Sequence, residues 1–325
     1  MPEVTYAQAL NQALREEMRR DPRIVLLGED IGKYGGVFGV TRGLFDEFGA
    51  ARVRDCPLNE ASIVGFGIGL AIAGMRAVTE LEFMDFATYA MDQIVNQAAK
   101  LRYIWGGQVS VPLVVRMPIV AELGFGSQHS QSLEAWFMHV PGLKVAIPAT
   151  AYDAKGLLKS ALRDNNPIVF VENVKLYASR SDVPEAEYLI PFGRADVKRA
   201  GDDVTIVAIS AMVHDALKAA ETLAEAGISA EVIDPRTLAP LDADTIIASV
   251  EKTGRLIVAH KANKTCGVGA EIAQIVSERA FDALDAPVVR VAAKDVPIPA
   301  SAPLEAATFP GADEIVAAAR TLVRR

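Results

Sequence analysis

Residues 204–234 read VTIVAISAMVHDALKAAETLAEAGISAEVID, and this stretch decides the fold class. Residues 204–209 form a short apolar run, which is typical of a buried strand, and residues 230–233 repeat that pattern. Between them, five apolar residues recur at helical spacing before Gly227, namely Ala216, Leu217, Ala220, Leu223 and Ala224. A strand, a helix and a second strand in this order predict a βαβ unit, so we expect the two strands to be parallel.

The same alternation extends in both directions from this unit. Downstream, strand patterns at 256–259 and 288–291 alternate with helical patterns from about Glu271 and from Asp313 to Leu322. Upstream, strand patterns at 24–27, 113–116, 144–147 and 168–171 accompany helices that begin near Thr5 and at about residue 152. The weakly patterned stretch 179–203 separates the two halves. We therefore expect an α/β protein with two mainly parallel sheets, in domains at residues 1–185 and 186–325.

The composition is that of a folded protein large enough for two cores. The chain has 325 residues, of which 51% are hydrophobic, and a net charge of -8. Acidic and basic residues are interspersed, which argues against a nucleic-acid partner, and no apolar run approaches the roughly 18 residues of a membrane span. The N-terminus lacks a leader pattern, and Cys56 and Cys266 lie outside any CxxC arrangement. We expect a cytoplasmic protein whose two cysteines are reduced.

The glycine-containing segment 63–69 admits two interpretations. A strand that runs into a glycine-rich turn would suggest a nicotinamide cofactor, but Leu70 stands where that fingerprint needs its third glycine. Alternatively, small residues let a helix pack closely against its neighbour. The chain also lacks the GxxxxGK[ST], GxSxG and HExxH motifs, so P-loop, serine-hydrolase and zinc-protease chemistry have no anchor.

The motifs above do not decide whether Glu60 and His129 have a functional or a structural role. Glu60 precedes a long apolar stretch, so it could simply interact with the dipole of a helix that it begins. Because that stretch is apolar on all sides, we expect a buried helix whose first carboxylate needs a partner. His129 lies in the small, polar run GFGSQHSQ at 124–131, which suits a ligand edge or a flexible loop. The other histidines are interpreted as structural residues, namely His139, His214 and His260.

Six long, ordered blocks of sequence identify a family. They are GEDIGKYGGVFGVTRGL (28–44), CPLNEASIVGFGIGLAIAGMR (56–76), EFMDFATYAMDQIVNQAAKLRY (82–103), SQHSQSLE (127–134), PGLKVAIPATAYDAKGLLKSALRDNNPIVFVEN (141–173) and EKTGRLIV (251–258). Together they resemble the beta subunit of the thiamine diphosphate-dependent decarboxylating component of 2-oxo acid dehydrogenase complexes. The resemblance implies a pyrimidine-binding domain with a mainly parallel sheet, followed by a transketolase C-terminal-like α/β domain.

The resemblance also implies roles for individual residues. Glu60 would be the carboxylate that hydrogen-bonds the aminopyrimidine ring of thiamine diphosphate and so controls its tautomer. Phe86 matches the family's aromatic residue beside that ring, and Leu58 matches an apolar wall residue. His129 matches the histidine near the reacting carbon, where it would transfer protons or stabilise charge. Two acids, Glu29 and Asp92, match residues that help to link two active sites through a polar channel.

Metal ions and partners are implied as well. The family holds a structural potassium ion mainly through main-chain carbonyls, which here would involve Leu113, Ala161, Leu162, Asp164 and Asn166. Because the chain has no GDG motif, an alpha subunit would supply the diphosphate and magnesium ligands in an α2β2 heterotetramer. Docking to a dihydrolipoyl acyltransferase core is also implied, with Asp285 and Arg325 as candidate contacts.

Pyruvate is the expected substrate, and alternatives within and outside the family remain open. The acetoin-cleaving and branched-chain 2-oxo acid enzymes are close competitors, because the absent alpha subunit shares the substrate pocket. A nonenzymatic scaffold of the same fold is a further alternative, although it predicts decay of Glu60, Phe86 and His129, all of which are present.

Overall fold

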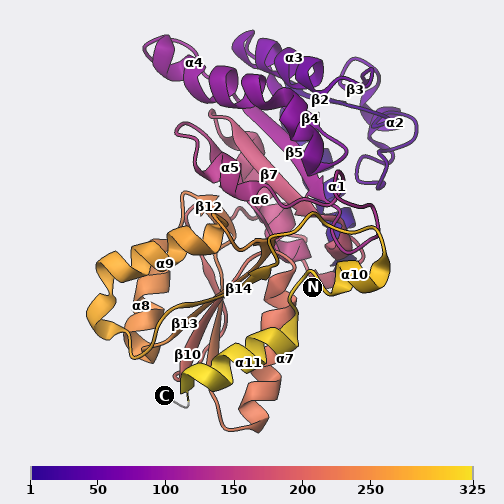
Figure 1. Cartoon of the computed structure of the whole chain (residues 1–325). Coiled ribbons are helices and arrows are strands. Elements are labelled where there is room, and N and C mark those ends of the chain that lie inside the picture. Colours follow the sequence, from indigo (N-terminus) through magenta and orange to yellow (C-terminus); the bar gives the residue numbers. More distant parts are fainter. Residues whose placement is uncertain (1, 324–325) are drawn as a thin grey trace. The chain divides into compact units, whose positions relative to one another are not determined.

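The computed structural model describes residues 2–323 (Figure 1). Its residue contacts divide the chain into two compact units. Unit 1 contains the chain up to Ala121 and His129–Phe192, and unit 2 contains Glu122–Gln128 and the chain from Gly193 onward. The expected boundary between residues 185 and 186 stays a prediction, and it assigns the segment Glu122–Gln128 to the first domain rather than to the second.

Unit 1 is built on a parallel sheet in the order β6-β7-β5-β4-β2-β3, in which neighbouring strands run parallel. The strands are β2 (Ile24–Gly28), β3 (Val53–Asp55), β4 (Arg76–Glu80), β5 (Leu113–Ile119), β6 (Lys144–Ala146) and β7 (Ile168–Asn173). β2, β5 and β7 are buried along their whole length, which is typical of a sheet covered on both faces. The strands expected in this half are confirmed, and β3 and β4 add to them.

Two amphipathic helices of unit 1, α1 (Tyr6–Arg20) and α6 (Ala151–Arg163), begin where their capping residues predict. Thr5 Oγ1 accepts a hydrogen bond from Gln8 N at 3.1 Å, while Thr5 N donates to Gln8 Oε1 at 2.9 Å. This is a complete capping box, in which two side-chain oxygens satisfy two backbone N–H donors reciprocally. Thr150 accepts from Asp153 N at 3.1 Å in the same way.

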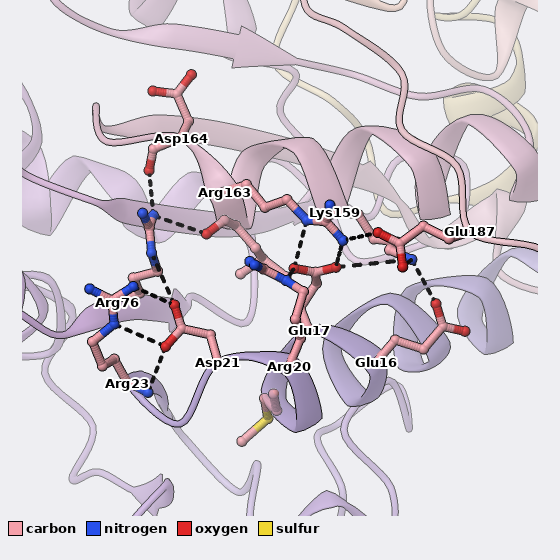
Figure 2. A network of polar contacts seen from close by, with 12 residues as sticks. Glu16, Glu17, Arg20, Asp21, Arg23, Arg76, Lys159, Arg163, Asp164 and Glu187 are labelled. Atoms are coloured by element: carbon pink, nitrogen blue, oxygen red, sulfur yellow. Dashed lines mark hydrogen bonds and ion pairs between the residues drawn. The ribbon is translucent and has the colours of Figure 1, made fainter.

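An ionic network joins α1 to α6 (Figure 2). Glu17 is only 1% exposed and accepts hydrogen bonds from Arg163 Nη2 at 2.6 Å and Arg163 Nε at 2.9 Å. Lys159, also 1% exposed, has its Nζ 2.9 Å from Glu16. A buried charge is tolerated only with such partners, so the network fixes how these two helices pack.

The other elements of unit 1 are shorter. They are β1 (Glu3–Thr5), α2 (Leu44–Phe48), α3 (Glu60–Ile72), η1 (Met84–Ala90), η2 (Asp92–Ala98), α4 (Ala99–Ile104), α5 (Glu134–Met138), η3 (Val174–Leu176) and β8 (Arg180–Asp182). β1 and β8 pair with each other in an antiparallel ribbon. Figure 1 shows α3 and α4 together along one side of the unit 1 sheet.

Helix α3 decides between the two interpretations of segment 63–69. The segment is helical throughout, so the strand and glycine-rich turn of a nicotinamide site are wrong. A Cβ atom at Gly67 would lie 2.6 Å from Thr79 Cγ2 and 3.0 Å from Leu113 Cδ1. Gly67 therefore lets α3 approach β4 and β5, as the packing interpretation expects. A Cβ at Gly69 would meet nothing within 4 Å, so this argument does not extend to it.

The expectation that α3 is buried on all sides is wrong for this chain. Ile63, Val64 and Ile68 are buried, whereas Phe66 is 59% exposed. A helix can be apolar all round when its second face is covered by something other than its own chain, and composition alone does not distinguish the two cases.

Unit 2 contains a sheet in the order β14-β13-β10-β11-β9. The strands are β9 (Asp196–Arg199), β10 (Val204–Ala208), β11 (Ala230–Asp234), β13 (Leu256–Asn263) and β14 (Val289–Ala293). β10 runs parallel to β11 and β13, β13 runs parallel to β14, and only β9 is antiparallel. The βαβ unit predicted at 204–234 is confirmed, with α7 (Met212–Glu225) between its strands and Gly227 at a φ of 75° after the helix.

The remaining elements of unit 2 are β12 (Thr237–Ala239), α8 (Ala243–Thr253), α9 (Val268–Arg279), η4 (Phe281–Ala283), α10 (Ala302–Ala306) and α11 (Ala312–Val323). The two helices expected from about Glu271 and at 313–322 correspond to α9 and α11. Within residues 2–323, no helix combines the length and the apolar character that crossing a bilayer requires.

Candidate active site

Three acidic side chains meet at the carboxyl edge of the unit 1 sheet. Glu29 directly follows β2, Glu82 lies just beyond the end of β4, and Glu60 is the first residue of α3, which follows β3. Because β3, β2 and β4 are parallel neighbours, their carboxyl ends lie at one edge, where α/β sheets bind ligands. We call Glu29, Glu60 and Glu82 the carboxylate cluster.

Two acids of the carboxylate cluster, Glu29 and Glu82, hold protons more tightly than isolated acids do. Burial raises the pKa of Glu29 to about 7, and the negative charges of Glu82, Glu60 and Asp30 add to this rise. Burial also raises the pKa of Glu82. Glu29 Oε1 is buried and has no hydrogen-bond partner within residues 2–323, while Glu60 is only 9% exposed. Near neutral pH, Glu29 can therefore accept or release a proton.

Three aromatic rings contact one another near this cluster's chain segment. Two of them, Phe83 and Phe86, follow Glu82 in the sequence. Phe83 and Phe86 have ring centroids 5.3 Å apart, and the His129 ring lies 5.2 Å from Phe83 and 5.3 Å from Phe86. All three pairs meet edge to face, which is a favoured geometry for aromatic rings. We call Phe83, Phe86 and His129 the aromatic triad, and Phe38 extends it at 6.0 Å from Phe83.

Hydrogen bonds join the segment just after His129 to η1. Asp85 Oδ1 accepts hydrogen bonds from Gln131 N at 3.2 Å and from Gln131 Nε2 at 2.7 Å. Leu133 N donates to Met84 Sδ at 3.3 Å. Asp85 is 5% exposed, and burial raises its pKa. Residues 131–133 therefore take their position from η1.

A buried ionic network lies on neighbouring strands of the same sheet. Arg116 on β5 is 1% exposed and donates to Glu172 at 2.6 and 2.9 Å, and also to Glu80. The Tyr177 hydroxyl donates to Glu172 as well. Burial raises the pKa of Glu80, which ends β4. The network thus fixes the strand end from which Glu82, Phe83 and Phe86 continue.

Leu58 and Asp92 are not brought into the carboxylate cluster. Leu58 is 76% exposed, so it forms no closed wall within this chain. Asp92 is exposed and accepts hydrogen bonds from Asn96 at 2.7 Å and Gln97 at 3.4 Å, both in its own π-helix η2. Asp285 is exposed in unit 2 and lies 3.4 Å from Arg255. Arg325 lies outside the described residues.

The carbonyls expected to hold potassium already have some partners. Arg76 Nη1 donates to the carbonyls of Leu162 at 3.1 Å and Asp164 at 2.8 Å, and Ala161 O accepts from Asp164 N. Each carbonyl oxygen keeps a second lone pair, so the potassium site, including Leu113 and Asn166, stays a prediction. Over residues 2–323, no three His, Cys, Asp or Glu side chains are grouped as metal ligands.

Comparison with known proteins gives matches along the chain. The transketolase pyrimidine binding domain matches residues 2–179, and the transketolase C-terminal domain matches residues 193–315. The mitochondrial pyruvate dehydrogenase E1 component subunit beta-2 of Oryza sativa subsp. japonica is 48% identical over 98% of this chain and 86% of its own length. Identity at this level over almost the whole chain decides the family.

The chain belongs to the family of thiamine-dependent 2-oxo acid dehydrogenase E1 beta subunits.

Two further comparisons match this E1 beta chain in sequence and in fold. The acetoin:2,6-dichlorophenolindophenol oxidoreductase subunit beta of Cupriavidus necator is 47% identical over 97% of this chain and 96% of its own. A solved structure described as a split gene transketolase, inactive beta4 tetramer, superimposes with a TM-score of 0.82 at 25% identity, covering 99% of this chain and 98% of that one. The transketolase-like fold of the E1 beta subunit expected from the sequence is thereby confirmed.

Glu82, Phe83 and Asp85 are site residues of this E1 beta chain to which sequence reasoning gave no role. The segment 82–86 does show a signal, because acids and aromatic residues alternate there directly after an apolar strand pattern. That pattern suits a pocket for a flat ring and equally an interface helix. Only the positions of β2 and β4 as neighbours bring Glu82 next to Glu29.

Proposed function

We propose that this chain forms the β half of a thiamine diphosphate site in an E1 component that decarboxylates pyruvate and passes the acyl group to a lipoyl domain. The observation that carries the proposal is the carboxylate cluster, in which Glu60 begins helix α3 beside two acids whose pKa values are raised. A carboxylate placed beside a ring nitrogen can share a proton with it.

The residues present fit the aminopyrimidine end of the cofactor. Glu29 Oε1 is a buried oxygen without a partner within residues 2–323, and a ring amino group would satisfy it or its neighbour. The aromatic triad offers ring faces and edges for a flat heterocycle. When bound, thiamine diphosphate supplies a carbon nucleophile for the 2-oxo group and an electron sink for decarboxylation.

Each residue of the site then has a defined task. Glu60 holds the proton on the ring nitrogen, and Glu29 and Glu82 supply or accept protons because their pKa values are raised. His129, which packs against Phe83 and Phe86, transfers a proton or stabilises charge near the reacting carbon. The proposed channel role of Asp92 requires a further chain, because its hydrogen bonds lie within η2.

The other half of the site belongs to an alpha subunit in this proposal. That subunit would supply the diphosphate and magnesium ligands in an α2β2 heterotetramer. Large exposed apolar side chains in unit 1 support a partner surface, including Phe66 at 59%, Tyr103 at 88% and Trp105 at 52% exposure. The acyltransferase core, the docking role of Asp285 and the potassium site also remain parts of the proposal.

Glu60→Gln tests the proposal directly. In the heterotetramer formed with the alpha subunit, this change should lower turnover by at least about 100-fold, because Gln cannot exchange the proton. Assembly, measured by sedimentation, should stay intact. The matched control is Glu221→Gln on an exposed position of α7, which should retain wild-type turnover. Near-normal turnover of Glu60→Gln would refute the role of Glu60 and favour a scaffold.

The substrate is tested by steady-state assays with pyruvate, branched 2-oxo acids and acetoin and an artificial electron acceptor. We expect the highest kcat/KM with pyruvate. Acetoin is the second candidate, because the acetoin oxidoreductase subunit is 47% identical to this chain and the pyruvate dehydrogenase subunit is 48% identical. A higher kcat/KM with acetoin would replace pyruvate but leave the cofactor proposal intact.

A further inference from the structure

His129 is held by two aromatic contacts and by the chain that follows it. Its ring meets Phe83 and Phe86 edge to face at 5.2 and 5.3 Å, and these two rings are 5.3 Å from each other, so the three rings form one cluster. One residue beyond it, Ser130 is fully buried, and the next residue, Gln131, is bound to Asp85. Phe83, Asp85 and Phe86 are neighbours at the start of η1, so one short segment of chain contacts both His129 and its loop.

Asp85 holds Gln131 at two points. The same oxygen, Oδ1, accepts from the backbone N of Gln131 at 3.2 Å and from its side-chain Nε2 at 2.7 Å. A two-point contact restrains both the backbone and the side chain of Gln131, so the loop cannot rotate there without losing a buried hydrogen bond. Only Ser130 separates this anchor from His129, which leaves little freedom for the imidazole.

The second oxygen of Asp85 has no part in this anchor. Asp85 Oδ2 is buried and has no hydrogen-bond partner within residues 2–323. An acid that served only to stabilise the fold would be expected to satisfy both oxygens, because an unsatisfied buried oxygen is costly. The unpaired Oδ2 of Asp85 therefore destabilises the fold, whereas its Oδ1 fixes the loop that carries His129.

We propose that Asp85 is a positioning residue, which holds the His129 imidazole against Phe83 and Phe86 by anchoring Gln131. Its effect on turnover rests on the proposed function, whereas its effect on the His129 ring does not. Because the anchor needs only the acceptor at Oδ1, Asp85→Asn should preserve it and Asp85→Ala should remove it. Gln131→Ala removes the side-chain half of the same contact from the other end.

The position of the ring is measured first, on the isolated chain without cofactor. In spectra of ε1-¹³C-labelled histidine, the His129 signal should be displaced by the currents of the two phenyl rings. Asp85→Ala and Gln131→Ala should move it toward the position of a free imidazole, and Asp85→Asn should leave it unchanged. Modification of His129 by diethyl pyrocarbonate should be at least about threefold faster in the first two variants, since their ring is less restrained.

Turnover is measured second, in the heterotetramer. Asp85→Ala and Gln131→Ala should each lower kcat by about tenfold or more, with KM changed less than about threefold, because misplacing a catalytic group costs rate rather than binding. Asp85→Asn should restore kcat to within about threefold of wild type. The double variant should lose little more than either single one, because both act on one contact.

The matched control is Asp153→Asn, the same substitution at a fully buried acid that accepts from Thr150 at the start of α6. It should leave both the His129 signal and kcat unchanged. An unshifted His129 signal in Asp85→Ala or Gln131→Ala overturns the proposal, as does failure of Asp85→Asn to restore kcat. If Asp85→Ala does not fold, Gln131→Ala decides alone. A normal kcat in His129→Ala would refute the catalytic role of His129, while the ring measurement would still test Asp85.

Discussion

At the scale of single residues, Glu29 has the clearest consequence for pH. Its pKa rises from an ordinary value of 4.5 to about 7, chiefly through burial and then through Glu82, Glu60 and Asp30. The folded chain therefore binds a proton at Glu29 that the unfolded chain has released. The contribution of Glu29 to the free energy of unfolding is highest below pH 4.5 and declines as the pH rises through 7.

Glu29→Gln should remove this decline. The variant should unfold a few degrees above the wild-type chain at pH 8 and at nearly the same temperature at pH 4.5, because Gln carries no charge to bury. Differential scanning calorimetry of the isolated chain at both pH values measures this. Glu221→Gln, an exposed counterpart on α7, should shift both temperatures equally little. A Glu29→Gln variant that is less stable at pH 8 would contradict the buried, proton-binding environment.

At the scale of elements, α3 links the packing of the sheet to the placement of Glu60. Asn59 caps the helix by accepting from Ser62 N at 2.9 Å, which sets the helix start at Glu60. Gly67, two turns later, sets how closely the helix approaches β4 and β5. Glu60 therefore occupies its place in the carboxylate cluster through the cap at the start of the helix and the close contact at its middle.

Gly67 and Gly69, two of the glycines of α3, give a matched pair of variants. Gly67→Ala should destabilise the chain by about 1 to 3 kcal/mol, because its methyl group would lie 2.6 Å from Thr79 Cγ2 in a filled core. Gly69→Ala has open space and should stabilise the chain by about 0.5 to 1 kcal/mol through helix propensity. Urea unfolding of the isolated chain measures both. Equal stabilisation by the two changes would show that α3 does not need Gly67 for its approach.

At the scale of the whole molecule, the proposed function assigns only one end of the cofactor to this chain. The side chains proposed for that end are the carboxylate cluster and the aromatic triad. In the same proposal, the remainder of the site belongs to the alpha subunit.

The isolated chain should accordingly bind thiamine diphosphate weakly or not at all. The diphosphate is the most strongly charged part of the cofactor, and the carboxylate cluster would repel rather than bind it. Calorimetric titration with thiamine diphosphate and magnesium, with and without the alpha subunit, measures this, and binding should become tight only in the heterotetramer. Tight binding by the chain alone would contradict a shared site.

The sequence by itself determined the family, the α/β class and many of the parallel strands and longer helices. Burial of β2, β5, β7 and β10 follows from continuous apolar runs, and the helices follow from caps and spacing that span only a few residues. Such signals are local, so they survive without knowledge of the partners across the fold. Glu60 and His129 could be named as site residues because the blocks around them are long enough to resemble a family.

Only the tertiary structure decided which side chains meet. Glu29 and Glu82 interact because β2 and β4 are neighbours, and Asp85 binds Gln131 although the two residues are 46 positions apart. The open side of α3 at Phe66 is equally invisible in the sequence, since apolar residues look the same whether they face a core or a surface. Contacts of this kind depend on strand order and helix approach, which no short stretch of sequence contains.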